Sequence, residues 1–168
     1  MGFLETAENR GENIMSGARI TGVKSWDETY MMMARDIAVM RSKDPCTQVG
    51  AFIADREHRP LSMGYNGAPR GWDDTVFPWG KTGGDAKNTK YPFVVHAERN
   101  AILNAPAGTR SLNGATMYVT RFPCGECAKE IAQAGISRVV YGQMKHNEDE
   151  SVAMMIFSHA GIMCEALE

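Results

Sequence analysis

This chain of 168 residues has few cysteines, a small net charge and no long hydrophobic run. No apolar stretch approaches the roughly 20 residues that a membrane-spanning helix requires, so we expect no membrane partner. The N-terminus lacks a basic segment leading into an apolar stretch, so we expect no secretory signal. The net charge of −2 argues against broad electrostatic attraction to a phosphate backbone, and we therefore expect no nucleic-acid partner.

The four cysteines do not form a disulfide framework. Cys124 and Cys127 have the spacing of metal ligands, which leaves Cys46 and Cys164 as two scattered thiols. Cysteines that are few and form no disulfide framework are typical of proteins in a reducing compartment. We therefore expect a cytoplasmic protein, in the host cytoplasm if the chain is viral.

The length and composition indicate one globular domain. Hydrophobic residues make up 43% and charged residues 23%, which is ordinary for a protein with a packed core. Residues 1–24 show no sustained apolar period and are rich in Gly, Asn, Glu and Thr. We expect them to form an N-terminal arm of low intrinsic order, and residues 25–168 to form the domain.

The first helix should begin at Ser25, where Ser25-Trp26-Asp27-Glu28 fits a capping box. Trp26, Tyr30, Met33, Ile37 and Met40 then recur at helical spacing, which predicts one apolar face. Pro45 ends this segment. Further helices are expected at 96–103, 124–134 and 151–159, and strands at 49–54, 61–65, 115–120, 139–141 and 162–166.

The order of these segments predicts the α/β class. A hairpin followed by alternating helices and strands favours a three-layer α/β/α domain with a partly parallel sheet. Between the second strand and the next helix lies a Gly-, Pro- and Trp-rich stretch from about residue 66 to 90. Loops longer than about 15 residues are uncommon unless they are functional, so we expect a lid or a ligand-binding loop.

Two short motifs predict a zinc centre. His96-Ala97-Glu98 is followed by Pro123-Cys124-Gly125-Glu126-Cys127. One imidazole and two thiolates fill three of the four tetrahedral positions of zinc, and the open position is typical of a catalytic site. Glu98 is then a candidate proton shuttle. The motifs can converge only if their helices lie side by side with the N-termini together.

Two other interpretations of the cysteine pair exist. A structural zinc knuckle would need a fourth ligand, for which His146 is the nearest candidate on the C-terminal side, and a redox pair would need no metal. The combination H-x-E with P-C-x-x-C favours the catalytic site, since it is the motif of the zinc nucleobase deaminases.

From Trp26 to about Gly161 the chain resembles the deoxycytidylate (dCMP) deaminases, a family of the cytidine and deoxycytidylate deaminases. The resemblance is carried by residues 41–45, 48–51, 64–69, 90–92, 96–102 and 122–129. It implies a cytidine-deaminase-like fold with a central mixed five-stranded sheet, and zinc-dependent deamination of dCMP to dUMP. It also implies a homo-oligomer, often a hexamer, that dCTP with Mg²⁺ activates and dTTP inhibits.

Several further residues are candidates for ligand contacts. The resemblance suggests that Asn66 binds the sugar, although Asn66 also suits a turn. Phe122, just before the proline of the zinc motif, is a candidate to stack on or border the base, although it also suits a core position. Ala97 is a further candidate for substrate binding. Arg41, Ser42 and Lys43 follow the first helix and are candidates for the substrate phosphate. Gly67, Arg70 and Lys90 are candidates for the phosphate of the substrate or of an effector.

Three rival functions remain at this point. A deaminase that acts on tRNA or single-stranded polynucleotide shares the zinc motif, but it needs a basic, aromatic-lined track. A zinc-stabilised binding protein without activity would not need Glu98. A deaminase that acts on dCTP as well as dCMP has the same pattern.

Overall fold

The computed structural model describes residues 20–106 and 112–167. Most of the expected N-terminal arm, residues 1–19, lies outside the described residues. The elements in chain order are α2 (Trp26–Arg41), β1 (Gly50–Ala54), β2 (Pro60–Tyr65), the 3-10 turn η1 (Ala86–Asn88), α3 (Ala97–Leu103), β3 (Thr116–Arg121), α4 (Gly125–Gln133), β4 (Arg138–Gln143), α5 (Glu148–Ala160) and β5 (Met163–Ala166). None of the helices described is long and apolar enough to cross a membrane.

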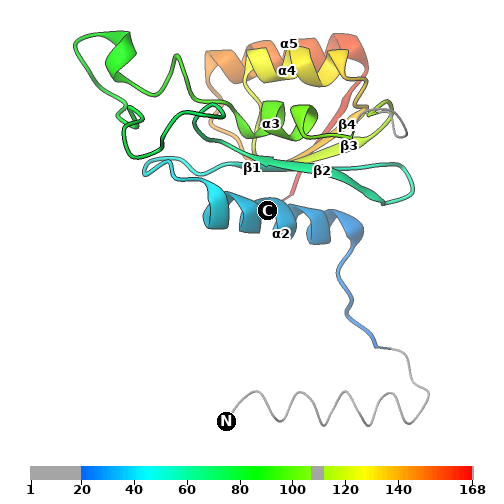
Figure 1. Ribbon diagram of the computed structural model, residues 1–168. Helices are drawn as coiled ribbons and strands as arrows, with labels where there is room; N and C mark the ends of the chain where they lie inside the picture. Colours follow the sequence, from blue (N-terminus) through cyan, green and yellow to red (C-terminus); the bar gives the residue numbers. More distant parts are fainter. Residues whose placement is uncertain (1–19, 107–111, 168) are drawn as a thin grey trace, which may run out of the picture.

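The strands form one mixed five-stranded sheet in the order β2-β1-β3-β4-β5. β1 pairs antiparallel with β2 and with β3, whereas β3, β4 and β5 run parallel. Helix α2 covers one face of the sheet and α3, α4 and α5 cover the other (Figure 1). The prediction of a three-layer α/β/α domain is therefore confirmed.

The buried face of α2 agrees only in part with the predicted one. Its buried residues are Tyr30, Met31, Ala34 and Ala38, while Met33 and Met40 are exposed. The reason is a close approach to the sheet: a β-carbon on Gly50 would overlap the carbonyl oxygen of Ala34. Small side chains let the helix backbone lie directly on β1. Of the expected face, Tyr30 is buried and Ile37 is half-buried.

Helix α5 begins one turn earlier than predicted. Asn147 is its N-cap, and its side chain accepts a hydrogen bond from the Glu150 backbone N–H at 2.9 Å. The Glu150 side chain completes the capping box by accepting the N–H of Asn147. The acidic residues 148–150, which were expected to precede the helix, therefore form its first turn, where they interact favourably with the helix dipole.

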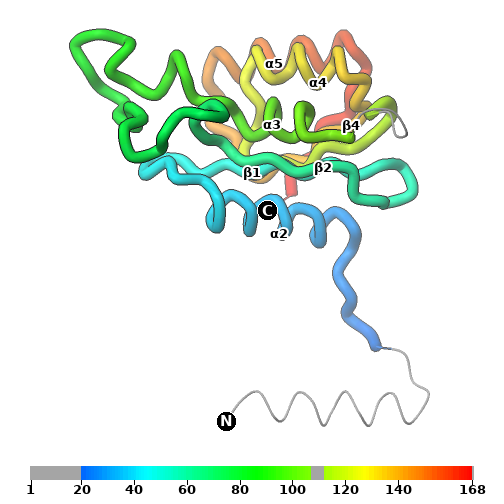
Figure 2. Tube along the Cα trace, in the orientation of Figure 1, coloured from blue at the N-terminus to red at the C-terminus, as the bar shows by residue number. Residues whose placement is uncertain are grey.

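The long stretch between β2 and α3 is a loop, as predicted, and η1 is its one helical element among the described residues. It extends beyond the end of the sheet and returns to it (Figure 2). The return is fixed by an isolated bridge, in which Gly67 and Val95 exchange backbone hydrogen bonds of 3.0 and 2.9 Å. The loop therefore begins and ends beside the start of α3.

An ionic network joins α2 to β4 and β5 at one edge of the sheet. The two terminal guanidinium nitrogens of Arg138 donate to Asp27, at 2.9 and 2.7 Å, and the Tyr118 hydroxyl donates to Asp27 at 2.8 Å. Arg138 also pairs with Glu165 on β5. The hydrogen bonds from Arg138 are the main reason why the pKa of the Asp27 carboxyl is lowered.

We expect Asp27→Asn to lower the free energy of unfolding at pH 7 by about 1–2 kcal/mol, because a charged acceptor of three hydrogen bonds is lost. Since folding lowers the pKa of Asp27, its contribution is fully present above the unfolded value of about 3.9 and disappears as the pH falls through the folded value. Urea unfolding of both proteins at pH 7 and pH 3 measures this. A difference that is the same at both pH values would contradict the assignment.

Candidate metal centre and substrate cavity

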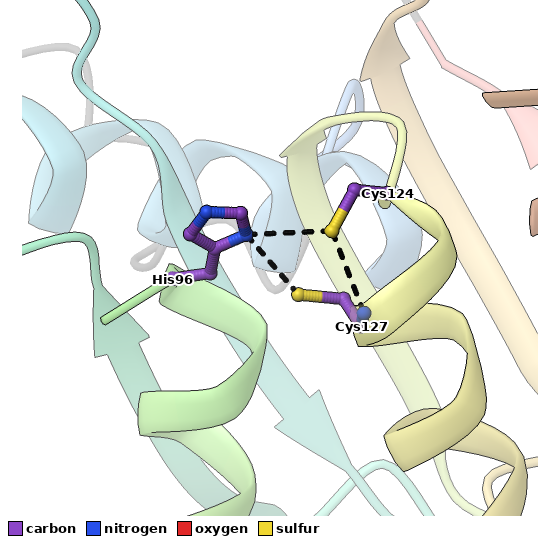
Figure 3. A group of neighbouring side chains, drawn as sticks. All are labelled: His96, Cys124 and Cys127. Carbon is purple, nitrogen blue, oxygen red and sulfur yellow. Dashed lines mark hydrogen bonds between the residues drawn. The ribbon is translucent and has the colours of Figure 1, made fainter. Parts of the chain in front are cut away.

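Three predicted zinc ligands come together where α3 and α4 begin. His96 is the N-cap of α3, Cys124 is the N-cap of α4, and Cys127 lies in the first turn of α4. Figure 3 shows the imidazole facing both sulfur atoms across the gap between the two helices. An ion pair between Arg99 and Glu130 links the same helices one turn further on. The expectation that the two N-termini lie together is confirmed.

Close packing against the sheet fixes the position of α3. A β-carbon on Gly64 of β2 would overlap the carbonyl oxygen of Ala97 and the backbone nitrogen of Ala101. The glycine therefore lets the helix backbone rest on the strand. α4 is positioned by β3, which ends at Arg121 only three residues before Cys124.

The distances between the donor atoms fit a zinc ion. His96 Nδ1 lies 3.5 Å from Cys124 Sγ and 3.4 Å from Cys127 Sγ. All three donor atoms lie within 4.8 Å of one another. A tetrahedral site with Zn–S of about 2.3 Å and Zn–N of about 2.1 Å has N···S edges of about 3.6 Å. Among the described residues this group has three members and does not include His146, which is exposed.

Local hydrogen bonds favour negative charge on the sulfur of Cys124, whereas the hydrogen bond with Cys124 and burial raise the pKa of the Cys127 thiol. The pKa of the Cys124 thiol is lowered to about 3, first by the hydrogen bond from the Cys127 side chain and then by His96 and the Cys127 backbone N–H. The hydrogen bond with Cys124 in turn raises the pKa of His96. A thiolate at a helix N-terminus is a strong metal ligand.

Glu98 lies beside His96, Cys124 and Cys127, which we call the metal group. It is almost fully buried, with 4% of its surface exposed. It is in the first turn of α3, two residues after His96. Burial is the largest cause that raises the pKa of its carboxyl. A carboxyl group shielded from bulk water and placed next to a metal group is suited to proton transfer.

The metal group opens into a cavity of about 340 Å³. Asn66, Lys90, Ala97, Glu98 and Phe122 line it together with His96 and Cys124. The Phe122 ring is itself buried and packs edge-on against Tyr141, with ring centroids 4.7 Å apart. The cavity therefore joins the metal group to four of the nine ligand-contact candidates: Asn66, Lys90, Ala97 and Phe122.

Both polar atoms of the Asn66 side-chain amide form hydrogen bonds within the protein. Its amide oxygen accepts hydrogen bonds from the Ser42 hydroxyl and the Val49 N–H, both at 2.8 Å. Its amide nitrogen donates to the Thr47 carbonyl at 2.8 Å and to Asp44 at 3.3 Å. Ser42 is thus placed behind Asn66, where it fixes the amide, and does not line the cavity itself.

The remaining candidates lie elsewhere. Arg41, Lys43, Gly67 and Arg70 line a second cavity, also of about 340 Å³, under the first part of the long loop. Within that cavity the Arg41 guanidinium lies 5.9 Å from the centre of the Tyr65 ring, and Lys43 pairs with Asp74. The structure therefore separates these residues from the metal group.

Some residues of the metal cavity have no counterpart among the sequence-based candidates. They include Lys81, Tyr91, Arg121, Lys145 and Asp149. A general signal could have found Arg121 and Lys145, because both lie at the carboxyl ends of adjacent parallel strands, where α/β proteins bind ligands. Lys81 and Tyr91 belong to the long loop, and their position depends on its path.

Known proteins resemble the chain in sequence and in structure. A sequence model described as the cytidine and deoxycytidylate deaminase zinc-binding region matches residues 24–143. Human deoxycytidylate deaminase is 45% identical over 139 residues, which is 82% of this chain and 76% of the human protein. The mouse deoxycytidylate deaminase is 43% identical with the same coverage.

Among solved structures, the dCMP deaminase of cyanophage S-TIM5 in complex with dCMP and dUMP is similar, with a TM-score of 0.65 and 29% identity over 83% of this chain and 95% of the other. A tRNA:A34 deaminase structure is 21% identical with a TM-score of 0.51, so it shares the fold alone. A family match over most of the chain, together with a relative at 45% identity, identifies the protein as an enzyme of the cytidine and deoxycytidylate deaminase family.

Proposed function

We propose that the protein hydrolyses dCMP to dUMP and ammonia and so supplies a precursor of thymidylate. The observation that carries the proposal is the placement of His96, Cys124 and Cys127 beside the buried Glu98 in one cavity. The identity with deoxycytidylate deaminases and the similarity to a structure that contains dCMP and dUMP support this substrate.

His96, Cys124 and Cys127 would hold zinc, which supplies Lewis-acid activation of a water molecule for attack at C4 of the base. Glu98 accepts a proton from the attacking water and donates it to N3 of the cytosine ring. It then transfers the second proton to the amino group, and the C4–N bond breaks to release ammonia. Phe122 and the closely packed helix start keep bulk water from this exchange.

A turnover assay tests the substrate. The protein is incubated separately with cytidine, deoxycytidine, dCMP, dCTP and a stem-loop RNA, and ammonia is measured. We expect dCMP to have the highest kcat/KM. Equal turnover of dCTP would widen the substrate class to both nucleotides, and release of ammonia from the RNA alone would show a polynucleotide deaminase instead.

Removal of zinc should abolish activity and spare the fold. The core beneath α3, α4 and α5 consists of buried aliphatic and aromatic residues that do not depend on a metal. We therefore expect chelated protein to lose turnover and keep its far-UV circular dichroism, and Zn²⁺ to restore activity. Unfolding on chelation would indicate a structural metal site, as in a zinc-stabilised binding protein.

The second cavity supports effector control. We propose that it binds dCTP with Mg²⁺ as activator and dTTP as inhibitor, with Arg41, Lys43, Gly67 and Arg70 as contacts. Its aromatic residues Trp72 and Trp79 offer a surface for a base. Dose curves of both nucleotides at low dCMP concentration test this proposal. Rates that neither nucleotide changes would refute it.

We further propose a homo-oligomer in the cytoplasm, with the hexamer as the favoured form. Large apolar side chains are exposed on two helices: Val39 and Met40 on α2, and Val152 and Met155 on α5. Exposed apolar surface of this kind is typical of subunit interfaces. Light scattering after size-exclusion chromatography measures the number of subunits.

A further inference from the structure

We propose that Arg121 and Lys145 bind the 5′-phosphate of the substrate and thereby set the preference for a nucleoside monophosphate over a nucleoside. The inference rests on the proposed deamination of dCMP and adds its specificity-determining residues. It replaces the expectation that Arg41 and Lys43 contact the substrate phosphate, since these two line the other cavity.

The first argument is position. Arg121 is the last residue of β3 and pairs with Gln143, the last residue of β4, in a parallel ladder. Lys145 follows two residues after Gln143. Both side chains line the cavity of the metal group. They therefore lie at the carboxyl ends of adjacent parallel strands, where open α/β sheets bind ligands, and Arg121 is three residues from the metal-binding Cys124.

The second argument is charge. The cations that line this cavity are Lys81, Lys90, Arg121 and Lys145. Lys90 is buried and forms an ion pair with Asp44, so its charge is already neutralised. Within residues 20–106 and 112–167, no acidic group lies within ion-pairing distance of Arg121 or Lys145. A nucleoside monophosphate carries a charge of about −2 near neutral pH, which matches these two cations.

Nearby carboxylates fix the loop that carries Lys145 and do not neutralise its ammonium group. Glu150 is 3% exposed, and its side chain accepts the backbone N–H of Lys145 at 2.7 Å and of Asn147 at 3.4 Å. Asp149 accepts the Gly125 N–H at 3.0 Å, which ties the start of α5 to the start of α4. The backbone at Lys145 is thus held in place relative to the metal group before a ligand binds, which reduces the entropic cost of binding.

The guanidinium of Arg121 adds geometry to charge. Its planar fork can donate two parallel hydrogen bonds to phosphate oxygens, whereas Lys145 provides a compact point charge. Lys81 also reaches the cavity, but it belongs to the long loop, whereas Arg121 ends β3 and Lys145 closely follows β4. We therefore assign the main contacts to the two residues at the strand ends.

The experiment measures kcat/KM for dCMP and for deoxycytidine in the wild type, Arg121→Gln and Lys145→Gln. Hydrogen bonds to charged groups contribute enough that we expect the dCMP:deoxycytidine ratio to fall about 10- to 100-fold in each variant. The selectivity of the wild type should also decline as ionic strength rises. Lys87→Gln is the matched control, since it removes one positive charge outside both cavities and should leave the ratio unchanged.

A second measurement does not depend on turnover. Calorimetric titration of the same proteins with dUMP and with deoxyuridine should show that each variant loses affinity for dUMP by a similar factor while its affinity for deoxyuridine stays the same. An unchanged dCMP:deoxycytidine ratio in either variant overturns the assignment. The assignment is also overturned if Arg41→Gln loses the selectivity for dCMP while the Arg121 and Lys145 variants keep it. A wild type that does not deaminate dCMP at all would refute the proposed function itself.

Discussion

Glu98→Gln is expected to lower kcat for dCMP by about three to four orders of magnitude while the zinc content stays unchanged. The amide has the shape of the carboxyl group, but it neither accepts nor delivers a proton. Glu98 is not a member of the metal group, so the three donor atoms remain in place. Steady-state kinetics and elemental analysis of the purified variant measure the two quantities.

Glu126→Gln is a suitable control for this variant. Glu126 is also in the first turn of a helix beside the metal group, but it is exposed and pairs with Lys129. The same chemical change there should alter kcat less than twofold. Near-normal turnover in Glu98→Gln would remove the carboxyl from the proton transfer, and loss of zinc in that variant would show that Glu98 supports the metal group.

The local motifs of the metal group were readable from the sequence because the ligands are close together in the chain. His96 and Glu98 lie in one turn of α3, and Cys124 and Cys127 in one turn of α4. The only long-range prediction was that the N-termini of α3 and α4 lie side by side. This arrangement is strongly favoured when a strand connects two helices that pack on the same face of a sheet. Layer order and sheet composition follow from the same alternation.

Features that depend on distant contacts were harder to predict. Helical spacing predicted the buried face of α2 only in part, because the close approach of Gly50 to Ala34 also selects small residues for that face. The phosphate candidates were basic residues that follow the first helix or lie in the long loop, and no contact in the sequence linked them to the zinc motif. The structure places Arg41 and Lys43 under the long loop and brings Arg121 and Lys145 to the metal cavity.

Lys90 illustrates the same point most clearly. In sequence it is one of several basic residues of a polar loop. In the structure only 4% of its surface is exposed, and its ammonium group pairs with Asp44, a residue 46 positions away. Asp44 in turn accepts the backbone N–H groups of Cys46 and Thr47 at 2.9 and 3.1 Å. The pair therefore fastens the end of the long loop to the segment that holds Asn66.

Asp44→Asn is expected to lower the free energy of unfolding by about 3–5 kcal/mol, because it leaves the ammonium group of Lys90 buried without a counter-ion. The asparagine oxygen can still accept the two backbone N–H groups, so the decrease in the free energy of unfolding comes mainly from the missing negative charge. Lys90→Met should cost less, since Asp44 keeps its hydrogen bonds from Cys46, Thr47 and Asn66. Urea unfolding of both single variants and of the double variant completes a cycle.

In that cycle the double variant Asp44→Asn/Lys90→Met should be more stable than Asp44→Asn alone, because the uncompensated charge is gone. Lys43→Met provides the comparison with an exposed pair: it breaks the contact with Asp74 at the surface and should cost no more than about 1 kcal/mol. If the double variant were the least stable of the three, the pair would owe its effect to the packing of the lysine stem and not to its charge. Because Asp44 also holds the Asn66 amide, the Asp44 variant should in addition raise KM for dCMP, an effect that Lys43→Met should not share.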